Sequence, residues 1–341
     1  VGTGPFKLRE FARDSDVALD AFDGYVLGRP KLDTIEVRFI TDGNTMMANI
    51  LAGEVELYLG RGLSIEQGIQ VRDQWSNGRL EPTGSSDVNL WPQLLNSDPQ
   101  VIGDVNFRRA LHYALDLREM ANVLTVGLGN PVDSFVHSTD PEFNDVEDAI
   151  VRYPFDPART TEMITGLGYT RGADGLLRDH AGATIPVEIR TLSADLNQKT
   201  TLSVVDYWRR AGVDASITTI APQRQNDAEY RATFPGFQLL MGPSTPDRLL
   251  SSRAPLPANN FLATGNYPRY LNPEYDTLVN RYFATVPKDQ RIPVLRDIVH
   301  VLTDQLPVLP LFQYLNPALI SGRLLKVVPG STYGAQEWDV R

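Results

Sequence analysis

Two apolar runs, far apart in the sequence, constrain the fold of this chain most strongly. The first lies at the start of LWPQLLNSDPQVIGD, residues 90–104, and the rest of this stretch is a polar segment with a proline. The second is LPVLPLFQY, residues 306–314. We expect each run to be a strand that carries the chain between two bodies. A chain of 341 residues is long enough for two domains. The predicted division is residues 1–96 for part of a first domain, 97–306 for the second, and 307–341 for the return.

Residues 104–124, directly after the first run, predict one amphipathic helix. Its apolar stripe consists of Phe107, Ala110, Leu111, Ala114 and Leu115. Asp104 can cap the first turn, because its carboxylate can accept from backbone N–H groups that have no partner there. We interpret Arg108, Arg109 and His112 as packing or surface groups, so function should lie beside this helix.

The remaining chain alternates strands and helices, which is typical of an α/β fold. A strand over residues 32–40, a helix to residue 51 and a strand over 55–59 predict one strand–helix–strand unit. Residues 185–241 repeat the pattern, with a helix over 195–211 whose Leu202, Val205 and Trp208 should point inward. Two further helices are predicted, over residues 273–284 and 287–305.

Composition excludes several classes of function. A net charge of −10 argues against a general nucleic-acid binder, because neutralising phosphates needs a basic face. The absence of cysteine excludes disulfides and thiolate chemistry within the chain. The four histidines have no metal-ligand spacing, and no familiar catalytic motif occurs. We therefore expect no cofactor, no metal and no enzyme activity.

The sequence shows neither the pattern of a membrane span nor that of an export signal. No apolar run reaches the length of about 18 residues that a span requires. The first residues, VGTGPFKLREF, lack the pattern of a signal peptide and read as a turn leading into a strand. We expect the chain to be part of a longer one.

The segment most suggestive of chemistry is the irregular stretch of residues 242–270. Long irregular segments in compact domains are often functional, and Asn, Arg and Tyr side chains make directed contacts to polar ligands. The alternative is a solvated surface loop, and Trp91 is as well explained by a core position as by a ligand contact. The candidate ligand-binding residues are Trp91, Asn96, Gly242, Ser244, Asp247, Arg248, Asn260 and Tyr267.

Six segments in order make the chain resemble the family 5 extracellular solute-binding proteins, the oligopeptide-, dipeptide- and nickel-binding components of ABC importers. They are VGTGPFKL, KLDTIEVRFITDGNTMMANILAGEVEL, FRRALHYALDLREM, YPFDPARTTEMITGLGY, NYPRYLNPEYDTLV and LPVLPLFQY. The resemblance covers nearly the whole chain.

The resemblance implies an α/β, two-lobed, periplasmic-binding-protein-like fold of type II, a flytrap that closes on its ligand by a hinge. It also implies that the N-terminal part of lobe I is missing. The partners it implies are a small polar solute or peptide and the permease subunits of an ABC importer, with no nucleic acid. The protein would be a periplasmic or extracellular monomer, associated with the membrane through the transporter.

One departure from the family pattern bears on the ligand. Peptide-binding members carry an acidic residue before the irregular segment, which pairs with the α-ammonium of the peptide. Here the stretch is LLMGPSTPD, with Gly242 in place of the acid and Asp247 further on. A sugar, an opine-like compound or a modified amino acid would fit as well as a peptide. Two alternative functions remain, a signalling receptor and a hydrolase that uses Asp247, Arg248 and a histidine.

Overall fold

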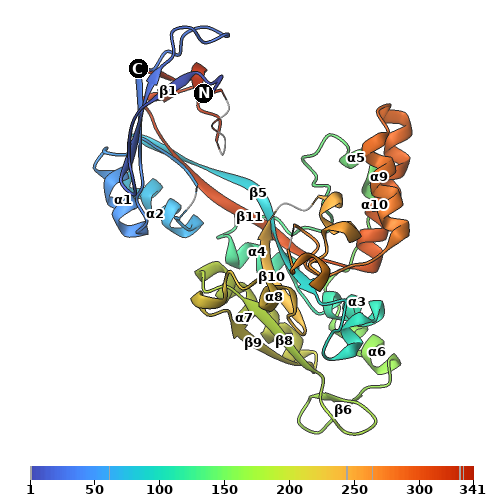
Figure 1. Ribbon diagram of the computed structural model, residues 1–341. Coiled ribbons are helices and arrows are strands. Elements are labelled where there is room, and N and C mark those ends of the chain that lie inside the picture. Colours follow the sequence, from blue (N-terminus) through green and yellow to red (C-terminus); the bar gives the residue numbers. More distant parts are fainter. Residues whose placement is uncertain (1, 61, 243–244, 263, 330–331, 333) are drawn as a thin grey trace. The chain divides into compact units, whose positions relative to one another are not determined.

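The computed structural model describes residues 2–60, 62–242, 245–262, 264–329, 332 and 334–341 (Figure 1). The chain forms two compact units, Val1–Ser85 with Leu315–Arg341, and Ser86–Tyr314. It changes unit within two long strands, β5 (Gly78–Pro92) and β11 (Leu309–Ser321). The change therefore comes earlier in the outbound strand, and later in the return strand, than the predicted divisions after residues 96 and 306.

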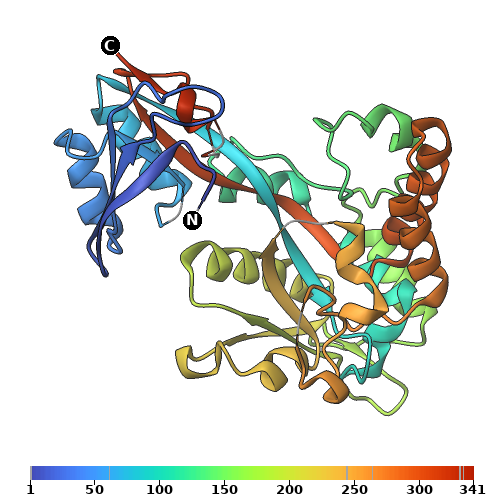
Figure 2. The ribbon, with the colours of Figure 1, turned by 45° about the horizontal axis from the view of Figure 1, so that its top comes forward.

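The first unit combines a small antiparallel sheet with two helices (Figure 2, blue). Its elements are β1 (Phe6–Ala12), β2 (Asp16–Ala21), β3 (Thr34–Arg38), α1 (Gly43–Leu51), β4 (Leu57–Leu59), α2 (Ile65–Gln74), β12 (Leu324–Leu325), the 3₁₀ helix η7 (Ala335–Glu337) and β13 (Asp339–Val340). Asp42 caps α1 by accepting from the backbone N–H of Thr45 at 2.8 Å. Ser64 and Gln67 cap α2 through reciprocal side-chain and backbone bonds, a capping box.

The predicted strand–helix–strand unit of residues 32–59 is wrong in its pairing, although its elements exist. β3 pairs antiparallel with β2, a strand that the sequence reading missed, in the register Val17↔Val37. β4 pairs instead with β11, in the register Ala318↔Leu59. Local periodicity identifies a strand, but the partner of a strand is a tertiary choice that periodicity does not report.

The second unit is α/β, as the pattern of residues 185–241 predicted. Its elements are η1 (Gln100–Gly103), α3 (Val105–Tyr113), α4 (Leu117–Leu124), α5 (Phe143–Val146), η2 (Glu147–Ala149), α6 (Pro157–Gly166), β6 (Thr170–Arg171), β7 (Leu177–Arg178), β8 (Pro186–Thr191), α7 (Asp195–Arg210), β9 (Asp214–Thr219), η3 (Pro222–Arg224), α8 (Ala228–Ala232), β10 (Phe237–Gly242), η4 (Pro246–Leu249), η5 (Ser251–Arg253), η6 (Pro257–Asn259), α9 (Pro273–Ala284) and α10 (Lys288–Gln305). The sheet order is β4-β11-β5-β10-β8-β9. β8 runs parallel to β9 and β10, whereas β10 runs antiparallel to β5.

The predicted single helix of residues 104–124 is two helices, α3 and α4. The carboxylate of Asp116 accepts from the backbone N–H of Glu119 at 2.9 Å, which caps a new helix start and ends the first one. The predicted cap at Asp104 is confirmed by its bond from the N–H of Asn106 at 2.7 Å. The predicted apolar stripe, from Phe107 to Leu115, is buried in the core of the second unit.

Arg108 and Arg109 of α3 attach this helix to the C-terminal end of α10, where Arg109 donates to the carbonyl of Asp304 at 3.0 Å. The Arg108 side chain is 4% exposed, and its guanidinium donates to the carbonyls of Ile102, Gly103, Gln305 and Leu306 at 2.6 to 3.0 Å. The last carbonyls of a helix have no partner within it and carry the negative end of its dipole. Arg108 therefore fills a structural role, as predicted, and its burial lowers its pKa to about 10.

The prediction for α7 is partly wrong. Val205 and Trp208 are buried, and the indole Nε1 of Trp208 donates to the carbonyl of Leu111 at 3.0 Å. Leu202, however, is 58% exposed. It lies about 200° around the helix from the buried Val204, on the solvent side.

Candidate functional site

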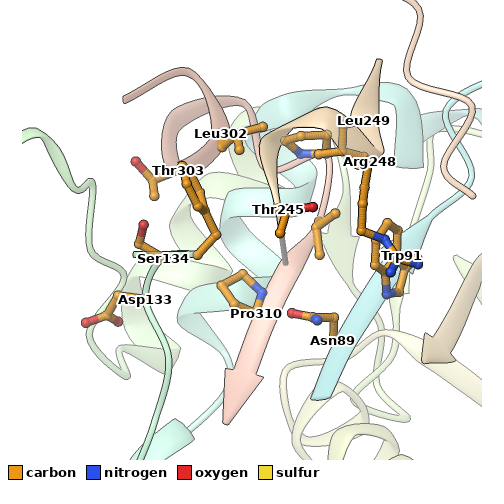
Figure 3. A pocket seen from close by; sticks show the side chains of 13 residues that line it. Asn89, Trp91, Asp133, Ser134, Thr245, Arg248, Leu249, Leu302, Thr303 and Pro310 are labelled. Carbon is orange, nitrogen blue, oxygen red and sulfur yellow. The ribbon is translucent and has the colours of Figure 1, made fainter. Parts of the chain in front are cut away.

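A pocket of about 50 Å³ opens within the second unit (Figure 3). It is lined by Asn89, Trp91, Asp133, Ser134, Phe135, Thr245, Arg248, Leu249, Leu302, Thr303, Pro307, Val308 and Pro310. Figure 3 shows Arg248, Trp91 and Asn89 on one side of it, and Ser134 and Thr303 on the other. A volume of this size holds a few water molecules or one small polar group of a ligand.

Strand β5 supplies the polar and aromatic part of the floor. Asp87, Asn89 and Trp91 alternate along β5, so their side chains share one face of the sheet. All three are buried, between 0% and 3% exposed. Of the three, Asn89 and Trp91 line the pocket, and β10 pairs with this end of β5 from Asp87 to Pro92.

The irregular segment that follows β10 is ordered by side chains that bind its backbone. Tyr275 donates its hydroxyl to the carbonyl of Pro246 at 2.7 Å. Asn266, which is fully buried, donates its amide to the carbonyls of Leu249 and Leu250 at 3.1 and 3.0 Å. These bonds hold the short helix η4, which carries Arg248 into the lining of the pocket.

The guanidinium of Arg248 makes no hydrogen bond or ion pair with any described residue, and its Nε is buried without a partner. Its sequence neighbour Asp247 pairs instead with Arg253 at 2.7 Å. The pocket therefore contains a guanidinium whose donors are available, because the nearest carboxylate in the segment is already engaged.

A second charged group lies beside the floor of the pocket. The Nε2 of His137 is 3.1 Å from Oδ1 and 3.2 Å from Oδ2 of Asp87, and its Nδ1 is 3.3 Å from the amide nitrogen of Gln313. The hydrogen bond that His137 donates to the carboxylate of Asp87 raises the pKa of His137. The negative charge of Asp87 adds to this effect, and burial opposes it. Asp87 is 1% exposed, so this pairing is what makes a buried carboxylate tolerable.

The structure brings part of the predicted site together. Trp91 and Arg248 line the pocket, and Tyr267 packs edge-on against Trp91 with ring centroids 5.8 Å apart. Gly242 ends β10 opposite Asp87. As ligand-binding residues, all of these remain predictions.

Of the predicted site residues, only Trp91 and Arg248 are among those that line the pocket, so Tyr267, Gly242, Asp247, Asn96 and Asn260 lie outside its lining. Asp247 is engaged with Arg253, as described above. Asn96 and Asn260 are exposed and have positive φ angles of 64° and 53°, so turn geometry explains their residue type. Ser244 lies outside the described residues.

Sequence reasoning missed several lining residues. Asn89 could have been predicted, because alternation along the strand places its side chain on the same face as that of Trp91. Leu302 and Pro310 were not, because they come from α10 and β11 and reach the pocket only through the tertiary fold.

The chemistry that this arrangement supports is recognition by charge and hydrogen bonds. Among the described residues, no group of three His, Asp or Glu side chains could hold a metal ion. In the same part of the chain, no helix is both long and apolar enough to cross a membrane. His112, predicted to be a packing or surface group, is 2% exposed and is bonded through Nε2 to the carbonyl of Pro310 at 3.0 Å.

Comparison with known proteins gives a family match and a fold match. The model of the family described as bacterial extracellular solute-binding proteins, family 5 Middle, matches residues 1–255. Heme-binding protein A of Haemophilus influenzae is 24% identical over 330 residues, which are 95% of this chain and 56% of that protein. The dipeptide-binding protein of Escherichia coli is 22% identical over 314 residues, 91% of this chain and 55% of that protein. The chain thus spans little more than half the length of these curated relatives.

Solved structures confirm the predicted fold class, α/β and periplasmic-binding-protein-like. NikA from Brucella suis, solved in complex with Fe(III)-EDTA, superposes with a TM-score of 0.81. It shares 20% sequence identity, and the match covers all of this chain and 68% of that one. The oligopeptide-binding protein AppA of Bacillus subtilis, solved with a nonapeptide, gives a TM-score of 0.74 over 99% of this chain.

Proposed function

Since the chain belongs to the bacterial extracellular solute-binding proteins, family 5, we propose that it acts as the substrate-binding receptor of an ABC importer. It would capture a small polar solute and deliver it to permease subunits in the membrane. It would work as a monomer in the periplasm or outside the cell. Its function would be binding and not catalysis.

The observation that carries this proposal is a polar recognition pocket within a chain of this family. The lining offers a guanidinium, an amide and an indole N–H among apolar side chains, from Arg248, Asn89 and Trp91. A few directed polar groups in an apolar setting are typical of small-molecule sites. Relatives bear the names of heme-, dipeptide- and glutathione-binding proteins, which supports a solute of this general kind.

A thermal-shift screen tests the binding function. The panel consists of dipeptides, glutathione, the nickel–histidine chelate, sugars and opines. A true ligand at 100 times its Kd should stabilise the folded protein by about 2.7 kcal/mol, and so raise the Tm by several degrees. No shift with any class, together with turnover in a hydrolase assay that Asp247→Ala abolishes, would overturn the proposal in favour of the enzyme.

Two further measurements test delivery and oligomeric state. Cells that lack the protein but keep the permease should lose high-affinity uptake of the compound found in the screen. Unchanged uptake together with a changed transcriptional response would favour a signalling receptor. Light scattering during size-exclusion chromatography should give the mass of one chain.

A further inference from the structure

We propose that Arg248 receives a carboxylate group of the ligand, so that the protein selects solutes by negative charge at this pocket. The inference rests on the proposed receptor function and deepens it. The planar guanidinium offers parallel N–H donors that match the two oxygens of a carboxylate. None of these donors is engaged by a described residue, although the side chain lines the pocket.

The carboxylates around the pocket already have partners among other side chains. Asp87 is bound by His137, Asp133 lies 3.5 Å from the guanidinium of Arg152, and Asp247 is bound by Arg253. Among the described lining residues, Arg248 is the charged side chain that has no partner in these pairings. An anionic group of the ligand would compensate the positive charge of Arg248, whereas an ammonium group would be repelled by it.

Gly242 has no side chain that could pair with Arg248. A Cβ built on Gly242 would stand 3.7 Å from Nη1 and 3.9 Å from Nη2 of Arg248, and no other atom of the described residues beyond its chain neighbours lies within 4 Å. An acidic side chain at this position would therefore pair with Arg248 and consume its charge. With glycine there, the guanidinium of Arg248 keeps its donors available to a ligand.

The surroundings of Arg248 strengthen an ion pair formed there. Trp91 and Leu249 are 3% and 5% exposed, and Leu302, Val308 and Pro310 complete a largely apolar wall. A charge-assisted hydrogen bond in such a setting is stronger than one in water. The pocket volume of about 50 Å³ suits a carboxylate and not a whole solute, so this is a subsite for one end of the ligand.

Matched acid and neutral compounds test the inference by isothermal titration of the full chain. The probes are dialanine against dialanine amide, and glutathione against glutathione diethyl ester. The wild-type protein should bind the acid of a pair about 10- to 100-fold more tightly than its neutral counterpart, which is the range expected for a charge-assisted hydrogen bond.

Four variants assign the preference to Arg248. Arg248→Gln should abolish it, and Arg248→Lys should keep part of it, because an ammonium retains the charge but not the paired donors. Gly242→Asp should weaken acid binding by supplying an internal partner, and should do so more than Gly242→Asn, which has the same size without the charge. Arg118→Gln removes one positive charge from the exposed face of α4 and should leave the preference intact.

The outcomes separate this inference from the receptor function. Neutral compounds that bind as well as acids, or a preference that persists in Arg248→Gln, would overturn the role of Arg248 and leave the receptor function standing. If no probe of either charge binds to the wild-type protein, the carboxylate preference is contradicted, and the receptor function is decided separately by the broader thermal-shift panel. Loss of the preference in Arg118→Gln would mean that net charge, and not the pocket, selects the ligand.

Discussion

Gly265 lies directly against the backbone of Arg248. A Cβ built on the glycine would stand 2.9 Å from the carbonyl oxygen of Arg248 and 3.0 Å from its Cα. Gly265 also has a φ of +149°, which side chains rarely adopt. The backbone of Arg248 can therefore occupy this position only because residue 265 has no side chain.

Gly265→Ala should lower the free energy of unfolding by about 2–4 kcal/mol, because backbone strain adds to a clash with main-chain atoms that cannot rotate away. Urea denaturation measures this loss. Gly182→Ala is the control: its φ is +84°, but nothing lies within 4 Å of the added Cβ, so it should cost about 1 kcal/mol for the backbone alone. Equal losses in the two variants would contradict the clash.

Arg108→Leu should be among the most destabilising substitutions in α3. It would remove the guanidinium that binds the carbonyls of Ile102, Gly103, Gln305 and Leu306, several of them buried. A buried polar group left without a partner costs about 1–3 kcal/mol, so the total loss should exceed about 3 kcal/mol. Thermal denaturation checks this. Arg118→Leu, on an exposed position of α4, should change stability by less than about 0.5 kcal/mol.

His112 should make the protein less stable in acid. Burial lowers its pKa to about 4 from the ordinary value of 6.5, so the folded state binds fewer protons than the unfolded state between these pH values. The free energy of unfolding should therefore fall as the pH drops from about 6.5 to about 4, by at most about 3 kcal/mol from this group. Urea denaturation across this range measures the slope, and His112→Gln should flatten it. An unchanged slope in the variant would assign the acid sensitivity to carboxylates.

His137 should show the opposite dependence. Its hydrogen bond with Asp87 raises its pKa above 6.5, so its contribution to stability is complete below that pH and is lost as the pH rises through the folded-state value. NMR titration of the ring protons should show His137 titrating above the ordinary value and His112 below it. Asp87→Asn should bring the pKa of His137 down, and a pKa that stays raised would contradict the assigned cause.

The sequence predicted best those elements whose limits are set by local chemistry. The helix predicted over residues 273–284 is observed as α9 with the same limits, since Asn272 caps it and Pro273 opens it. The break between α3 and α4 also has a local sequence signal, because Asp116 is followed three residues later by Glu119, as in a capping box. The continuous apolar stripe across the break led to the prediction of one helix.

Contacts between distant segments could not be predicted in this way. Periodicity gave β3 no indication that its partner is β2, and the burial of Arg108 depends on carbonyls at the end of α10. The candidate site shows the same limit. Trp91 and Arg248 were selected by residue type, whereas Leu302 and Pro310 reach the pocket only because α10 and β11 fold back upon it.

The pairing of β11 with β4 also sets an order for events on the ribosome. The unit of residues 86–314 is continuous and emerges in one stretch, so it can fold while synthesis goes on. The other unit has its N-terminal part made first, yet β4 must wait for residues 318–320, from near the end of the chain, before it gains this neighbour. Within these 341 residues, the unit whose β4 is translated first is therefore completed last, and this edge of β4 stays unpaired until β11 has been made.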